Sequence, residues 1–249
     1  GQVRGLDQLW RTTTPLRALW AEDAARAFVD PDSTTAALVA RLGLDGRVRE
    51  ATLEQLVTDA EETAALRAGL AARVTALLDL LVDQADALGS GLSRRALALP
   101  VFPDQDGRPG PLVGVDPRLP GPPPDGDVVL ACRPEVAPHL QALGRRVLAA
   151  PHAAQATTVL VAAGLAPLEV ADLTRVIARA PREVCARLDV AAVQALLVAH
   201  RDALAASFPA KARPGAPPAS PHLAALLIWQ TVAGTLARGV DLVEPGPLL

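Results

Sequence analysis

An internal similarity constrains this chain more than any single motif does. Phe102 aligns with Trp229 and Gly107 aligns with Gly234, both at a shift of 127 residues. Each pair belongs to a short apolar run that is followed by turn-forming residues. Similarity at a fixed interval indicates that one structural unit occurs more than once.

The match continues beyond these two pairs. The triplet Gly-Val-Asp at 114–116 returns at 239–241, and Pro-Gly-Pro at 120–122 returns at 245–247. In the first copy, the apolar run at 98–102 and the run PLVGV that follows predict the two strands of a β-hairpin. The segment PDQDG between them is rich in Asp and Gly, which tolerate the positive φ of a tight turn.

The segments in front of each hairpin also correspond. The stretch ATLEQLVTDA at 51–60 matches ADLTRVIARA at 171–180. Apolar residues at helical spacing predict a series of helices in each half. We expect these helices at 34–44, 51–70, 71–88, 136–150, 157–165, 170–180 and 189–208.

These patterns predict an α+β fold that is predominantly α, with two tandem helical units each followed by a short β-hairpin. We expect residues 1–33 to be the tail of a preceding unit, because LWRTTTPLRAL resembles LIWQTVAGTLA. Residues 34–127 and 128–249 then form the two helical-plus-hairpin units. The segment 117–127 is rich in Pro and Gly and is expected to connect them.

An isolated hairpin is marginal in water, so each predicted hairpin must rest on its helices. Phe102 and Trp229 are the large side chains of their runs and are the expected anchors, with Gly107 and Gly234 in the turns. The alternative is that the two rings form a platform for a ligand. A ring of this kind buries on the order of 150 to 250 Å².

Composition limits the possible partners. The chain has 24 basic and 27 acidic residues that are interspersed, which argues against nucleic acid or an anionic membrane as partner. Only 2% of the residues are aromatic, so the core must consist of Leu, Val and Ala. Cys132 and Cys185 are expected to be buried thiols in a reducing compartment, and we predict a cytoplasmic protein.

The sequence contains no pattern that specifies a chemistry. Asp104 opens a segment that begins like a calcium loop, but the glycine and the terminal glutamate are not at the required positions. No phosphate-binding glycine loop occurs, and the four histidines are scattered without metal-ligand spacing. We therefore assign no catalytic, cofactor-binding or metal-binding residue.

Two short motifs resemble a known family. The stretch LPVFPDQDGR at 99–108 is similar to the phrase Leu-Pro-aromatic-Pro-x-x-x-Gly that recurs in sacsin-like proteins. LLIWQTVAGT at 226–235 resembles a degraded copy, with Leu227 where Pro is usual. Sacsin-like proteins are very large chaperone-related chains with ATPase modules of the gyrase and histidine-kinase (GHKL) type. The resemblance implies a portion without catalytic residues, with any ATPase elsewhere in a longer chain.

Two main hypotheses follow. The first is a scaffold or interaction segment of a larger chaperone-like or conflict-system protein, which binds protein partners or other domains of its own chain. The second is an enzyme whose site lies in the cleft between the units, near His200 or Asp104. A helical nucleic-acid binder needs a clustered Arg face, and the chain offers only pairs such as Arg145 and Arg146. The beginning and end of the sequence suggest an excerpt from a longer protein.

Overall fold

The computed structural model describes residues 9–11, 13–20, 27–29, 37–38, 41–43, 49–118, 123–185 and 187–200. Within them the fold is predominantly helical with a few short strands, which confirms the predicted α+β class. The second predicted hairpin, with Trp229 and Gly234, lies outside the described residues. The arrangement of two tandem units therefore stays a prediction.

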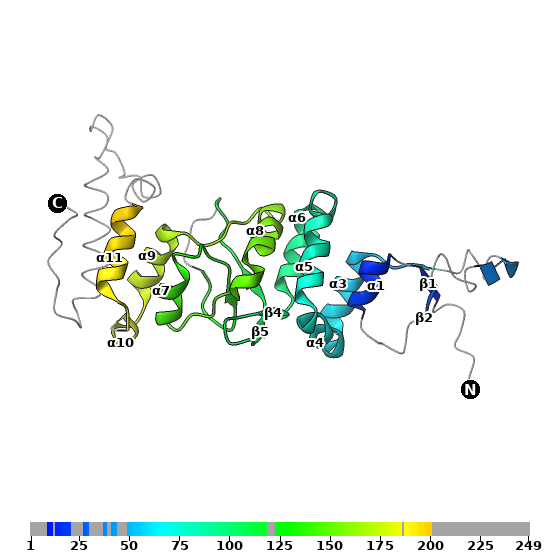
Figure 1. Ribbon diagram of the computed structural model, residues 1–249, viewed down its shortest axis with the longest axis horizontal. Helices are drawn as coiled ribbons and strands as arrows, with labels where there is room; N and C mark the ends of the chain where they lie inside the picture. The colour runs from blue at the N-terminus through cyan, green and yellow to red at the C-terminus, as the bar shows by residue number, and fades with distance from the viewer. Residues whose placement is uncertain are drawn as a thin grey trace, which may run out of the picture.

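The described elements are spread along the long axis of the molecule, with α1 toward one end and α11 toward the other, and α8 lies beside α6 (Figure 1). The helices are α1 (Thr14–Leu19), α3 (Leu53–Glu62), α4 (Ala64–Ala72), α5 (Val74–Asp83), α6 (Ala85–Ala98), α7 (Ala137–Ala142), α8 (Ala153–Ala162), α9 (Val170–Arg179), α10 (Arg182–Cys185) and α11 (Val190–Ala199). The strands are β1 (Leu9–Arg11), β2 (Ala27–Val29), β3 (Arg49–Glu50), β4 (Phe102–Pro103), β5 (Pro109–Gly110), β6 (Leu112–Val113) and β7 (Val129–Leu130).

Several expected helices are interrupted where the apolar pattern is continuous. The expected helix at 51–70 divides into α3 and α4 at Thr63, whose φ of −111° and ψ of 111° are not helical. Arg67 stabilises this break, because its Nη1 donates to the carbonyls of Ala60 at 2.9 Å and Glu61 at 3.0 Å. These carbonyls have no partner within α3, so a side chain satisfies them.

The helix expected at 71–88 divides into α5 and α6 at Gln84, and Gly89 interrupts the helical geometry once more. Gly89 has a φ of +65° and kinks α6, and the chain then resumes a helical path to Ala98. The expected first strand at 98–102 is therefore wrong over most of its length, because α6 extends into it and β4 begins only at Phe102.

The hairpin exists with a different return strand. β4 pairs antiparallel with β5, with Phe102 opposite Gly110. The turn contains Gly107 with a φ of +78°, as its sequence predicts. The run at 111–115 does not return along β4, since β6 pairs in parallel with β7. The run at 111–115 therefore pairs with β7, which lies outside the hairpin.

Parallel pairing around a central strand occurs twice in the described residues. In the first sheet, β1 lies between β2 and β3, and both neighbours run parallel to it. Further along the chain, Leu130 bridges Val147 and Cys132 bridges Leu168, both in parallel. In the first set, the central strand β1 is followed by the short helix α1, and its neighbour β3 leads into the longer helix α3. In the second set, the central segment at 130–132 is followed by the short helix α7, and the segment at Leu168 leads into the longer helix α9.

The buried apolar residues form two clusters, and the first of them crosses both predicted unit boundaries. The first cluster includes Leu16, Leu19 and Trp20 as well as residues of α3 to α6, and α8 completes it by packing against α5 and α6. The second cluster is built from α7, α9, α10 and α11. The divisions expected at residues 33 and 127 thus do not coincide with gaps between the cores.

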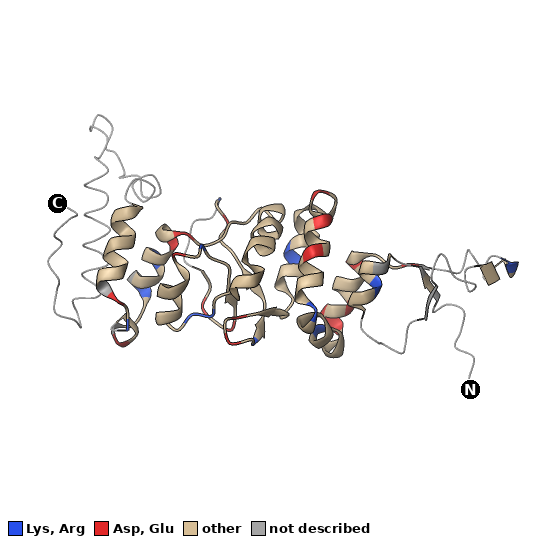
Figure 2. Ribbon diagram, viewed as in Figure 1, with Lys and Arg blue, Asp and Glu red and all other residues tan. Residues whose placement is uncertain are grey.

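Charged residues are distributed along the described elements, with basic and acidic side chains on the same helices (Figure 2). None of the described helices has the length and apolar character needed to cross a membrane.

Candidate binding pocket

The turn of the hairpin is held by a buried carboxylate. The side chain of Asp104 is 0% exposed, and its Oδ1 accepts hydrogen bonds from the backbone amides of Asp106 and Arg108, each at 2.9 Å. Its Oδ2 accepts from Nε of Arg146 at 2.7 Å. Both oxygens therefore serve the geometry of the turn and its attachment to the rest of the fold.

Arg146 joins the hairpin to the segment after α7. Its Nη2 donates to the carbonyls of Arg108 at 2.6 Å and Pro109 at 2.9 Å, and its Nη1 pairs with Asp127. Burial disfavours the charged form of Asp104, but hydrogen bonds from Arg146 and two backbone amides outweigh it, so the pKa of Asp104 lies below its ordinary value. A carboxylate held in this way is a structural group.

The residues predicted as hairpin anchors have the following positions. Phe102 is 0% exposed and lies in the first core cluster, and Gly107 forms the turn. Trp229 and Gly234 lie outside the described residues. Asp104, named for the enzyme hypothesis, is buried in the hairpin, whereas His200 follows the end of α11. Neither of these two lines the pocket described next.

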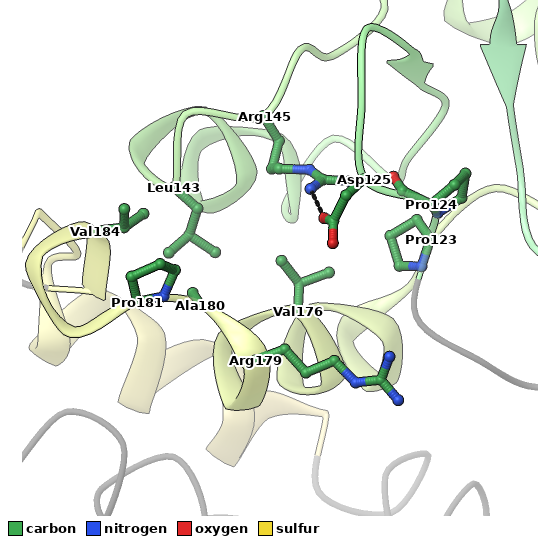
Figure 3. A pocket seen from close by; sticks show the side chains of 10 residues that line it. All are labelled: Pro123, Pro124, Asp125, Leu143, Arg145, Val176, Arg179, Ala180, Pro181 and Val184. Carbon is green, nitrogen blue, oxygen red and sulfur yellow. Dashed lines mark hydrogen bonds and ion pairs between the residues drawn. The ribbon is translucent and has the colours of Figure 1, made fainter.

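A pocket of about 610 Å³ lies between the connector before β7 and the helices of the second core. Pro123, Pro124 and Asp125 of the connector form one side, as Figure 3 shows. The opposite side comes from the end of α7, from α9 and from the start of α10. The apolar lining on this side consists of Leu143, Val176, Ala180, Pro181 and Val184.

Two arginines give the pocket its polar character. Arg145 is only 18% exposed and forms an ion pair with Asp125, and it also donates to the carbonyl of Pro124. Arg179 at the end of α9 is exposed, and no described residue forms an ion pair or hydrogen bond with it. The lining therefore carries one cation that is neutralised locally and one that is not.

The two cysteines have raised pKa values. Cys132 and Cys185 are free thiols, and burial raises the pKa of Cys132 to about 12. Burial also raises the pKa of Cys185. Both are therefore protonated near neutral pH and poor nucleophiles. Among the described residues, no three His, Cys, Asp or Glu side chains lie close enough to hold a metal ion.

Comparisons with protein-family models, with curated proteins and with solved structures found no match to this chain. The pocket itself could not be predicted from the sequence. Its lining comes from 123–125, 143–145 and 176–184, and each of these segments reads locally as a connector or as part of an amphipathic helix. The signal that the sequence does contain is the match between 51–60 and 171–180, which places Arg179 opposite Asp59.

Proposed function

We propose that this chain is a scaffold or protein-interaction segment, without catalytic residues of its own, of a larger multidomain protein. The proposed parent is a cytoplasmic, chaperone-like or conflict-system protein of the sacsin-like kind. Any ATPase activity of the GHKL type belongs to another part of that protein. The partners are other proteins or other domains of the same chain.

The observation that carries this proposal is that the least exposed ion pair holds the hairpin in place. Asp104 and Arg146 are the charged pair with the least exposed side chains in the described residues, and every oxygen of that carboxylate serves the hairpin. The arrangement supports a structural role. The described helices are arranged along one long axis (Figure 1), and an elongated row of helices suits binding of other proteins.

Nucleotide hydrolysis tests the proposal directly. The 249-residue chain and the complete protein that contains it are each incubated with magnesium and ATP, and release of inorganic phosphate is measured. We expect hydrolysis by the complete protein and none above buffer by the chain. Cross-linking of the complete protein, followed by mass spectrometry, is expected to join this segment to other domains or to co-purified proteins. Hydrolysis by the chain alone would refute the proposal.

A further inference from the structure

The two halves of the described chain provide an internal comparison for the pocket. Helices α3 and α9 match in sequence at a shift of 120 residues, and they bury equivalent positions. The equivalent pairs are Leu53 and Leu173, Leu56 and Val176, Val57 and Ile177, and Ala60 and Ala180, of which only Ala180 is partly exposed. The pocket is thus lined by a helix whose counterpart has a known environment.

The short helices α1 and α7 are equivalent in the same way. Each follows the central strand of parallel pairing. Each also has two buried leucines three positions apart, Leu16 and Leu19 in α1, and Leu140 in α7 with Leu143 directly after its end. In both places, the backbone amide of the residue after the second leucine donates a hydrogen bond to the carbonyl three positions earlier. That residue is tryptophan after α1 and glycine after α7.

In the first half, this tryptophan fills the space beside the longer helix. Trp20 is 2% exposed, and its indole Nε1 donates to Oδ2 of Asp59 on α3 at 3.2 Å. In the second half Gly144 stands at the place of Trp20, and Arg179 stands at the place of Asp59. Arg179 lines the pocket, and so do both chain neighbours of Gly144, Leu143 and Arg145, although Gly144 itself does not.

In this comparison, the pocket corresponds to the space that the ring of Trp20 fills in the first half. The charged side chain beside it is the basic Arg179, where the first half has the acidic Asp59. The first half offers a carboxylate to an indole N–H, whereas the second half offers a guanidinium. A ring that enters the pocket would contact Leu143, Val176 and the prolines of the connector (Figure 3). A carboxylate next to that ring would pair with Arg179, which has no acidic partner among the described residues.

We propose that this pocket binds an acidic segment of a partner protein through one aromatic side chain, with a flanking Asp or Glu paired to Arg179. The proposal rests on the proposed function, since it specifies the chemistry of a protein partner. The pocket's volume of about 610 Å³ accommodates an aromatic side chain and the residues next to it in the partner. Arg179 can also stack on the ring, which adds a cation–π attraction.

The test uses three capped tripeptides on the 249-residue chain. The probes are N-acetyl-Asp-Trp-Asp-amide, the same peptide with Ala in place of Trp, and the same peptide with both Asp replaced by Lys. Binding is followed by chemical-shift changes in the backbone amide NMR spectrum. We expect the acidic tryptophan peptide to shift amides at 143–145 and 176–184, and the two control peptides to bind at least about tenfold more weakly.

Two charge reversals separate the pocket from general electrostatics. Arg179→Glu should weaken the acidic tryptophan peptide by at least about tenfold, because it places like charges together. The matched control is Arg187→Glu, which reverses an exposed arginine that does not line the pocket and should change binding less than about twofold. Equal losses in the two variants would overturn the proposal.

Other outcomes would also overturn it. One is the absence of shifts at the pocket, and another is equal binding of the alanine peptide. The variant Trp229→Ala tests a third outcome. If the acidic tryptophan peptide binds this variant but not the unchanged chain, the chain's own later segment occupies the pocket and a partner protein is not its ligand. These results are independent of nucleotide hydrolysis, so a failure here leaves the proposed function open to its own test.

Discussion

Asp104 and Arg146 form a partly buried ion pair on which the turn of the hairpin depends. Replacing Asp104 by Ala removes the acceptor of two backbone amides and leaves the guanidinium of Arg146, 13% exposed, without its buried partner. We expect the free energy of unfolding to fall by about 3–5 kcal/mol. Urea denaturation followed by far-UV circular dichroism measures the change.

The matched control for this variant is Asp106→Ala in the same turn. The side chain of Asp106 is 59% exposed and pairs with Arg108 at 2.8 Å, so its removal should cost less than about 1 kcal/mol. If the two variants lose similar stability, the buried pair does not hold the turn.

The lowered pKa of Asp104 predicts how stability changes with pH. A carboxyl whose pKa is lower in the folded protein stabilises the fold above its unfolded pKa of about 3.9. This contribution is lost as the pH falls through the lower, folded pKa. The stability difference between the native chain and Asp104→Asn should therefore be large at neutral pH and shrink below about pH 4. Urea titrations between neutral and strongly acidic pH test this, and a constant difference would contradict it.

Two glycines should respond in opposite ways to alanine. A Cβ on Gly114 would lie 2.5 Å from the carbonyl oxygen of Ala166 and 2.8 Å from Cδ2 of Leu160. Gly114→Ala should therefore destabilise the fold by about 1–3 kcal/mol. A Cβ on Gly91 in α6 meets nothing within 4 Å, so Gly91→Ala should raise stability by up to about 1 kcal/mol. Thermal melting of both variants gives the signs, and a neutral Gly114→Ala would show that β6 and the segment at 166 do not pack this closely.

At the level of elements, the hairpin depends on its buried ring. Phe102 is 0% exposed within the first core cluster, so Phe102→Ala should lower the free energy of unfolding by about 3–5 kcal/mol. Val161→Ala on α8 is the control, since Val161 is 65% exposed and its truncation should cost less than about 0.5 kcal/mol. Chemical denaturation compares them. A loss below about 1 kcal/mol for Phe102→Ala would contradict its role as anchor.

Local sequence signals predicted the elements whose geometry is decided locally. The apolar stripe of 170–180 predicted α9 almost to the residue, and the turn chemistry around Gly107 predicted the reversal. The return strand was placed wrongly because tertiary pairing decides it: the run at 111–115 meets β7, which lies outside the hairpin. The break at Thr63 is stabilised by Arg67, a side chain from the next helix, and the apolar spacing contains no trace of it.

The pocket shows the same limit. Each lining segment has an ordinary local pattern, and the cavity arises only where a connector and two helices meet. Its chemistry follows from two exchanges between matched positions, Trp20 to Gly144 and Asp59 to Arg179. Such exchanges become informative once the surroundings of Trp20 are known, which is why the sequence alone led to hypotheses about His200 and Asp104 and not to this site.

At the scale of the whole molecule, the described halves share an order of elements. In the first half, the central parallel strand leads into α1 and a neighbouring parallel strand leads into α3. In the second half, the central segment leads into α7 and a neighbouring parallel segment leads into α9. The β6 strand then joins the hairpin region of the first half to β7 of the second. If the chain continues in this way, a second hairpin should follow α11, with Trp229 held by its helices.

A crystal structure of the chain that places residues 201–249 tests this account most directly. Residues 169–241 are superimposed on 49–116 through the matched helices α3 and α9. The account predicts that the ring of Trp229 occupies the place of Phe102 and that Gly234 adopts the positive φ of Gly107. A Trp229 in unrelated surroundings, or inside the pocket beside Arg179, would contradict it.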